Sequence, residues 1–248
     1  MKLAKDHWLY HIPFAHRGLH DKDGAPENTL QAFQLAIDKG YGIELDVQFS
    51  RDKKVMVFHD ERLEHLTNGD GLTKDQTAHA LGKLKVKGTD QSIPTLATVL
   101  ELVGGKVPVL VEIKGLEGGS DDLDAAVANE LDNYRGDFAV LAFNPLRLEW
   151  FANNRPNMLR GQNTERYLDG ELNIWRRFVY QHCLLNYKSR PNFISYEIDM
   201  LPNWRMRRFR KQNMPMISWT INNVSRLKAA RKYVDNIIFE KIDPEQVS

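Results

Sequence analysis

Short apolar runs with strand character alternate with amphipathic helical segments along the whole chain. The run at 12–16 is followed by a turn-rich loop and then by apolar residues at helical spacing, which end before Gly40; these are Leu30, Phe33, Ala36 and Ile37. Further strands are expected at 41–48, 55–59, 108–114, 138–143, 193–198, 215–220 and 236–240. Strand–helix alternation without a break in composition predicts parallel βαβ units.

The number of these units narrows the fold class. Seven or eight βαβ units in 248 residues fit a closed (β/α)8 barrel better than a doubly wound sheet. No GxGxxG motif follows the first strand, which removes the best sequence evidence for a dinucleotide-binding fold. We therefore predict an α/β protein with a single TIM-barrel domain over residues 1–248.

Two parts of the chain depart from the simple rhythm. The segment 61–95 is long for a connection and carries its own helix-like piece at 74–84, so we interpret it as a small insertion after the third strand. In the second half, 159–162 and 179–185 are predicted as short strands around a helix rich in Trp and Arg. The basic run at 205–211 is interpreted as a solvated helix.

Composition excludes several classes of protein. The chain has 34 Lys and Arg against 33 Asp and Glu, and this balance argues against a nucleic-acid partner. The single cysteine, Cys183, excludes an intramolecular disulfide and a cysteine-rich zinc site. No apolar run approaches the ~18 residues of a membrane span, and the first residues lack the apolar core of a secretory signal. We expect a cytoplasmic protein without a stable membrane anchor, as a monomer or small homo-oligomer.

Ionisable residues gather at the ends of the first predicted strands. They comprise two histidines, four carboxylates and two cations, namely His16, Arg17, Glu44, Asp46, His59, Asp60, Glu112 and Lys114. In a parallel barrel the carboxyl ends of all strands meet at one rim, where active sites are built. Three carboxylates suit a hard cation such as Ca²⁺ or Mg²⁺, and two histidines suit acid–base work near neutral pH. With two cations for an anionic group, the set points to phosphoryl chemistry.

Each of these features also has a purely structural interpretation. Either histidine is compatible with a hydrogen-bonded surface residue, and the Glu44/Asp46 pair with a salt-bridged rim. The Glu112/Lys114 pair is compatible with mutual neutralisation. Asn28 is equally compatible with capping the helix that begins at Thr29 and with contacting a ligand. Their recurrence at the same end of successive strands favours the functional interpretation, because buried charges are costly without partners.

Six motifs in order, over residues 15–115, resemble the glycerophosphodiester phosphodiesterase family. They are HRG, PENT, the ELD pair, HD after VMVF, the PTL segment and the EIK strand; AFNPLRLE and SWTIN are weaker echoes. The resemblance implies a TIM barrel with an insertion after the HD motif and a divalent metal held by Glu44, Asp46 and Glu112. It implies His16 and His59 as the acid–base pair, Arg17 and Lys114 on the phosphate, and Trp219 beside the glycerol moiety, for which a core tryptophan is the alternative.

The implied reaction splits a glycerophosphodiester into sn-glycerol 3-phosphate and an alcohol, by way of a cyclic phosphate. The chain departs from the family pattern at Glu240, where relatives carry a shorter carboxylate after the last strand. Two other functions remain open. One is a lysophospholipase D-type activity at a membrane surface, for which Trp175, Phe178, Trp204 and Phe209 would form an apolar rim unless they are core residues. The other is a non-catalytic barrel that binds a phosphodiester.

Overall fold

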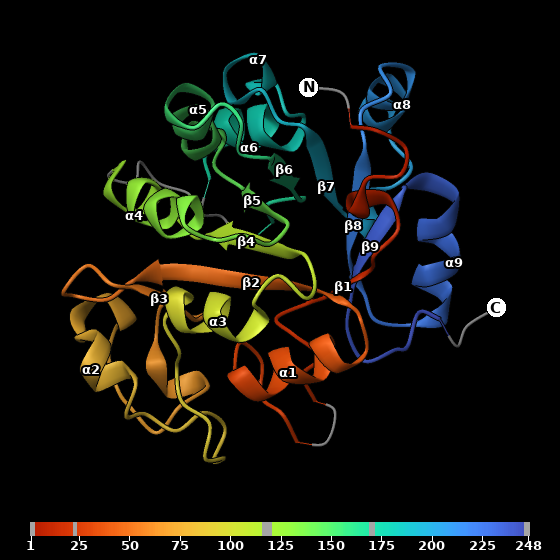
Figure 1. The fold of residues 1–248 in the computed structure, drawn as a ribbon. Coiled ribbons are helices and arrows are strands. Elements are labelled where there is room, and N and C mark those ends of the chain that lie inside the picture. Colours follow the sequence, from red (N-terminus) through yellow and green to blue (C-terminus); the bar gives the residue numbers. More distant parts are fainter. Residues whose placement is uncertain (1–2, 22–23, 116–120, 169–171, 246–248) are drawn as a thin grey trace. The chain divides into compact units, whose positions relative to one another are not determined.

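The computed structural model describes residues 3–21, 24–115, 121–168 and 172–245 (Figure 1). These residues fall into two compact units. The first unit contains Ala15–Lys114 and the segment that leads up to Phe138, and the second contains the residues up to Phe14 and those from Ala139 onward. The order of strands and helices along the chain is that of a (β/α)8 barrel, so the predicted fold class is confirmed. The single-domain boundary at 1–248 stays a prediction.

The first unit carries the strands on which the predicted site depends. Its elements are α1 (Leu30–Asp38), β2 (Gly42–Phe49), β3 (Val55–Val57), α2 (Ala78–Leu81), α3 (Leu96–Val103), β4 (Val109–Ile113) and α4 (Asp121–Asp132), and β1 (Phe14–Ala15) ends in it. Strand β4 is buried along its whole length, as expected for a parallel strand covered on both faces. Strand β2 pairs with it in parallel.

Local capping explains where the helices of the first unit begin. The hydroxyls of Thr29 and Thr95 accept hydrogen bonds from backbone N–H groups in the first turns of α1 and α3. Helix α3 ends at Gly104, whose φ of 54° is the left-handed conformation that glycine adopts readily. Helices α1 and α3 lie side by side in this unit (Figure 1).

Strand β3 differs from the prediction. It runs antiparallel to β2, with Val57 opposite Val47 and Val55 opposite Phe49, so it forms a hairpin and is not a parallel strand of the barrel. The reason is the length of the link: the five residues 50–54 suffice for a hairpin, whereas a parallel crossover needs a dozen residues or more.

The segment 61–95 has a small apolar core of its own. Besides α2 it contains two short 3₁₀ helices, Leu63–His65 and Thr73–Asp75. Side chains from this segment pack with the end of β3; the buried members are Met56, Phe58, Leu63, Leu81, Val86 and Ile93. Of the helix-like piece predicted at 74–84, only the four residues of α2 form an α-helix.

The second unit continues the alternation. After β5 (Phe138–Ala142) its elements are α5 (Pro145–Asn154), β6 (Arg160–Thr164), α6 (Ile174–Gln181), α7 (Asn186–Ser189), β7 (Phe193–Glu197), α8 (Trp204–Lys211), β8 (Met216–Ile221), α9 (Val224–Tyr233) and β9 (Asn236–Phe239), with 3₁₀ helices at Trp8–Tyr10 and Ile198–Met200. Strands β6 to β9 pair in parallel in sequence order. Within the described residues, no helix combines the length and the apolar character needed to cross a bilayer.

The predicted strand at 179–185 is wrong, whereas the one at 159–162 is confirmed by β6. Val179 and Tyr180 extend helix α6, and Tyr180 is its buried side chain, because it lies on the helix face that packs inward. The lone Cys183 is buried beside the strands β7 and β8 and has no disulfide partner.

Candidate active site

Three carboxylates of the first unit converge on one point. Glu44 and Asp46 lie two residues apart on β2 and therefore face the same side, and the register places Asp46 directly opposite Glu112 on β4. One carboxylate oxygen from each residue lies within 4.8 Å of the others. The three residues are only 2%, 2% and 8% exposed. Burying three carboxylates together is costly unless cations compensate them.

Two cations lie against this cluster. The Lys114 ammonium is 3.1 Å from Glu112 Oε1 and 3.6 Å from Asp46 Oδ1. The Arg17 guanidinium is 3.3 Å from Asp46 Oδ2 through Nε, and its Nη1 donates to Glu27 at 2.5 Å. The backbone N–H of Arg17 donates to Glu44 Oε2 at 3.1 Å. Three carboxylates thus face two cations, so these two cations do not fully compensate the negative charge of the cluster.

Asn28 fastens Asp46 to the loop before α1. Its amide Nδ2 donates to Asp46 Oδ2 at 3.0 Å, and its Oδ1 accepts the backbone N–H of Asp46 at 3.4 Å. The capping role considered for Asn28 is wrong, because Thr29 caps the helix. The sequence was equally compatible with a ligand contact for Asn28, and in the structure its side chain bonds to the carboxylate of Asp46.

The loop that carries His16 and Arg17 turns sharply at Gly18. Gly18 has φ +80°, and a Cβ on it would lie 2.9 Å from Ala32 and Phe33 of α1. A glycine is therefore required for the close packing of this turn on α1. His16, just before the turn, has Nε2 at 4.0 Å from Glu44 Oε2, and its side chain is 17% exposed.

His59 is oriented by its neighbour Asp60. Its Nδ1 lies 2.7 Å from Asp60 Oδ1, and the other carboxylate oxygen of Asp60 is 3.3 Å from Nδ1 of His65. Gln48 of β2 donates through Nε2 to the backbone oxygens of Phe58 and Asp60, which holds this loop against the sheet. Sequence reasoning noted Asp60 at the strand end but assigned it no role; its position directly after His59 is the signal.

The electrostatics of the cluster follow from burial and from mutual repulsion. Burial raises the pKa of Glu44 well above its usual range, and the charges of Asp46 and Glu112 raise it further. Burial also raises the pKa of Asp46, but the charges of Lys114, His59 and Arg17 outweigh it and hold the pKa of that carboxyl well below its usual range. For Lys114, burial lowers the pKa, and the adjacent carboxylates more than reverse the effect.

The donor set fits a hard divalent cation. Carboxylate oxygens are the ligands that Ca²⁺ and Mg²⁺ prefer, whereas zinc sites favour nitrogen and sulfur. The three oxygens come from two paired strands, so their spacing is set by the sheet. The pKa of Glu44 is raised first by burial and then by the charges of Asp46 and Glu112, and a bound cation would offset the repulsion from these two carboxylates.

Comparison with known proteins places the chain in a family. The model of the glycerophosphoryl diester phosphodiesterase family matches residues 16–243. The chain belongs to this family. It is 30% identical over 246 residues to the glycerophosphodiester phosphodiesterase of Caldanaerobacter subterraneus subsp. tengcongensis, covering 94% of this chain and 95% of that protein. The predictions of the family and of an enzyme of this kind are confirmed.

Solved structures of phosphodiesterases share the fold. An Oleispira antarctica phosphodiesterase in complex with the product sn-glycerol-3-phosphate superposes with a TM-score of 0.78 at 23% identity, covering 94% of this chain and 93% of that chain. The glycerophosphodiester phosphodiesterase of Thermotoga maritima gives a TM-score of 0.71 at 27% identity, covering 92% of this chain and 94% of that chain.

Trp219, which the family resemblance implies beside the glycerol moiety, and Glu240, which departs from the family pattern, both lie in the second unit. The Trp219 ring, on β8, packs edge-on against Phe143 with ring centroids 5.5 Å apart, and its buried indole Nε1 has no hydrogen-bond partner among the described residues. Glu240 follows β9, where its backbone N–H donates to Ile221 and its carboxylate lies 3.8 Å from the Lys241 ammonium.

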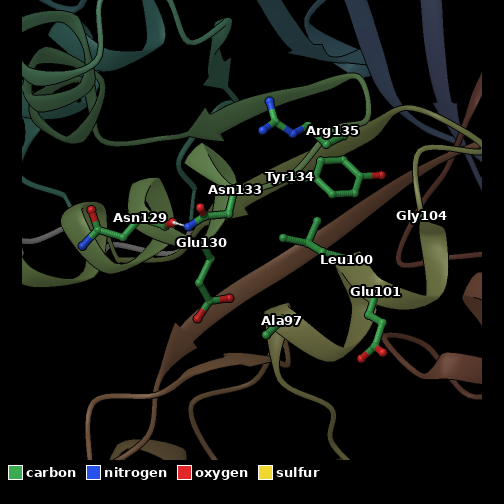
Figure 2. A pocket seen from close by; sticks show the side chains of 9 residues that line it. All are labelled: Ala97, Leu100, Glu101, Gly104, Asn129, Glu130, Asn133, Tyr134 and Arg135. Carbon is green, nitrogen blue, oxygen red and sulfur yellow. Dashed lines mark hydrogen bonds between the residues drawn. The ribbon is translucent and has the colours of Figure 1, made fainter.

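A groove of about 560 Å³ lies in the first unit between α3 and α4 (Figure 2). Its walls come from Leu100 and Ala97 on α3 and from Glu130 and Tyr134 on and after α4. Burial raises the pKa of Glu130 to about 7, and its Oε2 has no hydrogen-bond partner among the described residues. The groove contains none of the carboxylate-cluster residues.

Proposed function

We propose that this chain hydrolyses glycerophosphodiesters to sn-glycerol 3-phosphate and an alcohol, with a divalent cation held by Glu44, Asp46 and Glu112. The observation that carries the proposal is the cluster of these three buried carboxylates beside Arg17 and Lys114, in a member of this family. The name of the 30% identical relative and the product bound to the Oleispira antarctica protein support the substrate class. When bound, Ca²⁺ or Mg²⁺ would stabilise negative charge that develops on the phosphoryl oxygens.

Arg17 and Lys114 serve two purposes in this proposal. They hold carboxylates in place, since Arg17 pairs with Asp46 and Lys114 pairs with both Asp46 and Glu112. They also offer remaining N–H donors to the phosphate oxygens, since a guanidinium has five and an ammonium three. The fork of Arg17 suits two oxygens of one phosphate, and Lys114 acts as a point charge.

His16 and His59 are the proposed acid–base pair. An Nδ1–H donated to Asp60 leaves Nε2 of His59 as the proton-accepting atom of the neutral ring. One histidine takes the proton of a glycerol hydroxyl as its oxygen attacks phosphorus, and the other donates a proton to the oxygen of the alcohol that leaves. Water then opens the resulting cyclic phosphate with the two roles reversed, and sn-glycerol 3-phosphate is released.

The test is release of glycerol 3-phosphate from glycerophosphocholine, with and without a chelator. We expect chelation to abolish turnover and addition of Ca²⁺ or Mg²⁺ to restore it. His16→Ala and His59→Ala are expected to lower kcat by ~10²–10⁴-fold, whereas His79→Ala, at an exposed position on α2, is the matched control. Full activity of His16→Ala would refute the proposed acid–base pair.

A second candidate function is supported by three exposed rings. Trp175, Phe178 and Trp204 are exposed, which agrees with an apolar rim for lysophospholipids, whereas Phe209 is 6% exposed in the core and does not belong to it. Relative turnover of glycerophosphocholine and lysophosphatidylcholine distinguishes the two substrate classes. Binding of a divalent cation without turnover of either would instead support a non-catalytic barrel. A cytoplasmic location and a monomeric or small homo-oligomeric state remain predictions.

A further inference from the structure

Helices α6 and α8 of the second unit expose large apolar side chains that the proposed chemistry does not use. Ile174, Trp175 and Phe178 on α6 are 77%, 78% and 49% exposed, and Trp204 at the start of α8 is 55% exposed. We call these four residues the aromatic surface. The three on α6 fall within an arc of about 100° on a helix of 3.6 residues per turn, so they share one face. That face is turned to solvent, while Tyr180 is the buried side chain of the helix.

The side chains on the two helices are joined into one surface by His182. Its ring lies edge-on to Phe178 with centroids 4.6 Å apart and tilted against Trp204 with centroids 5.6 Å apart. Arg205 fixes this arrangement, because its Nε donates to the backbone oxygen of His182 at 2.6 Å and its guanidinium lies over the Trp204 ring, 4.8 Å from the centroid. The aromatic surface is therefore continuous and held in place within the second unit.

The charge of these two helices has one sign. Neither α6 nor α8 contains an acidic residue, and together they carry seven cations: Arg176, Arg177, Arg205, Arg207, Arg208, Arg210 and Lys211. Arg176, Arg207 and Arg208 are exposed. Arg176 follows Trp175 directly and lies about 100° round the helix from it, so it flanks the apolar arc. The surface is thus complementary to a partner that is both apolar and anionic.

We propose that the aromatic surface and its flanking cations bind reversibly to the surface of a bilayer that contains anionic phospholipid. An apolar helix face that carries Trp and Phe beside exposed Arg is typical of helices that lie in the interface between headgroups and acyl chains. Trp rings are favoured at that depth, and each basic residue near an anionic leaflet strengthens binding by about fivefold. The proposal does not depend on the proposed function, since it concerns binding and not turnover.

The test is co-sedimentation of the full chain with vesicles, at low ionic strength. One set of vesicles contains phosphatidylcholine alone and the other contains phosphatidylcholine mixed with phosphatidylglycerol. We expect binding to the mixed vesicles, a shift of tryptophan emission to shorter wavelength, and release by added salt. Lack of binding to the mixed vesicles would overturn the proposal, and equal binding to both sets would overturn the role of the cations.

Two variants with matched controls separate the apolar from the ionic contribution. Trp175→Ala with Trp204→Ala should weaken binding at least tenfold, whereas Leu146→Ala, at an exposed apolar position on α5, should not change it. Arg176→Glu with Arg208→Glu should weaken binding to the mixed vesicles at least tenfold. Its control, Lys39→Glu with Lys83→Glu, makes the same change in net charge at exposed positions of the first unit.

The same variants distinguish a lipid from a second copy of the chain. Thermal unfolding checks that each variant is folded, and the charge-reversal pair keeps the proposal testable if the tryptophan pair unfolds. Sedimentation velocity without vesicles measures self-association. If the tryptophan substitutions abolish self-association and leave vesicle binding unchanged, the surface is an interface between copies and the lipid proposal is wrong.

Discussion

Replacing Asn28 with glycine tests the contribution of a single side chain that hydrogen-bonds to the carboxylate cluster through Asp46. Asn28 is 2% exposed and holds Asp46 through a side-chain contact of 3.0 Å and a backbone contact of 3.4 Å. Its φ of 54° lies in the left-handed region, so glycine adopts the same backbone without the strain that alanine would add. The substitution therefore removes two hydrogen bonds and leaves the three carboxylates in place.

The expected magnitude follows from the charge on Asp46. A hydrogen bond to an ionised group contributes about 1.5–3 kcal/mol, and the 3.4 Å contact to the backbone is too long to add much. If this hydrogen bond serves to position Asp46, its loss should weaken the binding of a divalent cation by about 10–100-fold. The extra backbone freedom of glycine acts mainly on the stability of the fold, by up to ~1 kcal/mol.

The measurement is calorimetric titration of the purified chain with Mg²⁺ and with Ca²⁺, together with urea unfolding in the presence of a chelator. Asn213→Gly is the matched control, because Asn213 is also at positive φ (53°) but is exposed and belongs to the second unit. If Asn28→Gly lowers the free energy of unfolding but binds both cations as tightly as the parent chain, Asn28 stabilises the loop only. The reasoning that links it to the cluster would then be refuted.

Three further substitutions test other groups. Asp60→Asn should lower kcat by about 10²–10⁴-fold without unfolding the chain, because the amide no longer fixes the His59 tautomer; the pH profile of kcat/KM checks it. Lys114→Met should raise KM for glycerophosphocholine at least about tenfold, yet leave cation binding by calorimetry no weaker, since positive charge beside two carboxylates is removed. Burial raises the pKa of Glu130 to about 7 from 4.5, so stability falls as pH rises from about 4.5 to about 7. Glu130→Gln should then raise the free energy of unfolding by about 1–2 kcal/mol at pH 8, after allowance for solvent screening, and leave it unchanged near pH 4. Urea unfolding against the exposed Glu101→Gln control checks this, and an equal gain at both pH values would contradict it.

The cluster was predictable because it depends on strand periodicity and on the rim that parallel strands share. Two residues apart on a strand, Glu44 and Asp46 must share a face, and a charged residue inside the apolar run of β4 marks Glu112. Their convergence was expected because the carboxyl ends of parallel strands meet at one rim. That β2 and β4 are direct parallel neighbours was not predicted, because a third parallel strand was expected between them.

The direction of β3 and the contacts of individual side chains were harder to predict from the sequence. Strand periodicity is the same for parallel and antiparallel neighbours, so the reversal of β3 depended on the length of the link at 50–54. Asn28 and Thr29 are both good capping residues and adjacent, and the choice between them depends on which backbone turns first into the helix. In α8, Trp204 and Phe209 look alike in a run of arginines, and packing against β7 and β8 decides that only Phe209 is buried.

The net charge of +1 conceals local charges of opposite sign, and this changes which partners the composition excludes. The carboxylate cluster on β2 and β4 is an acidic centre with an incomplete complement of cations, whereas α6 and α8 carry seven cations and no acidic residue. Over a Debye length of about 8–10 Å, a partner senses the local charge and not the sum. Near-neutrality therefore argues against a polyanion that must cover most of the chain, but not against an anionic surface that meets only these two helices. The exposed rings between their cations favour a bilayer over duplex nucleic acid, because the phosphates of a duplex would contact the arginines alone, whereas a bilayer surface also takes up Trp175 and Trp204.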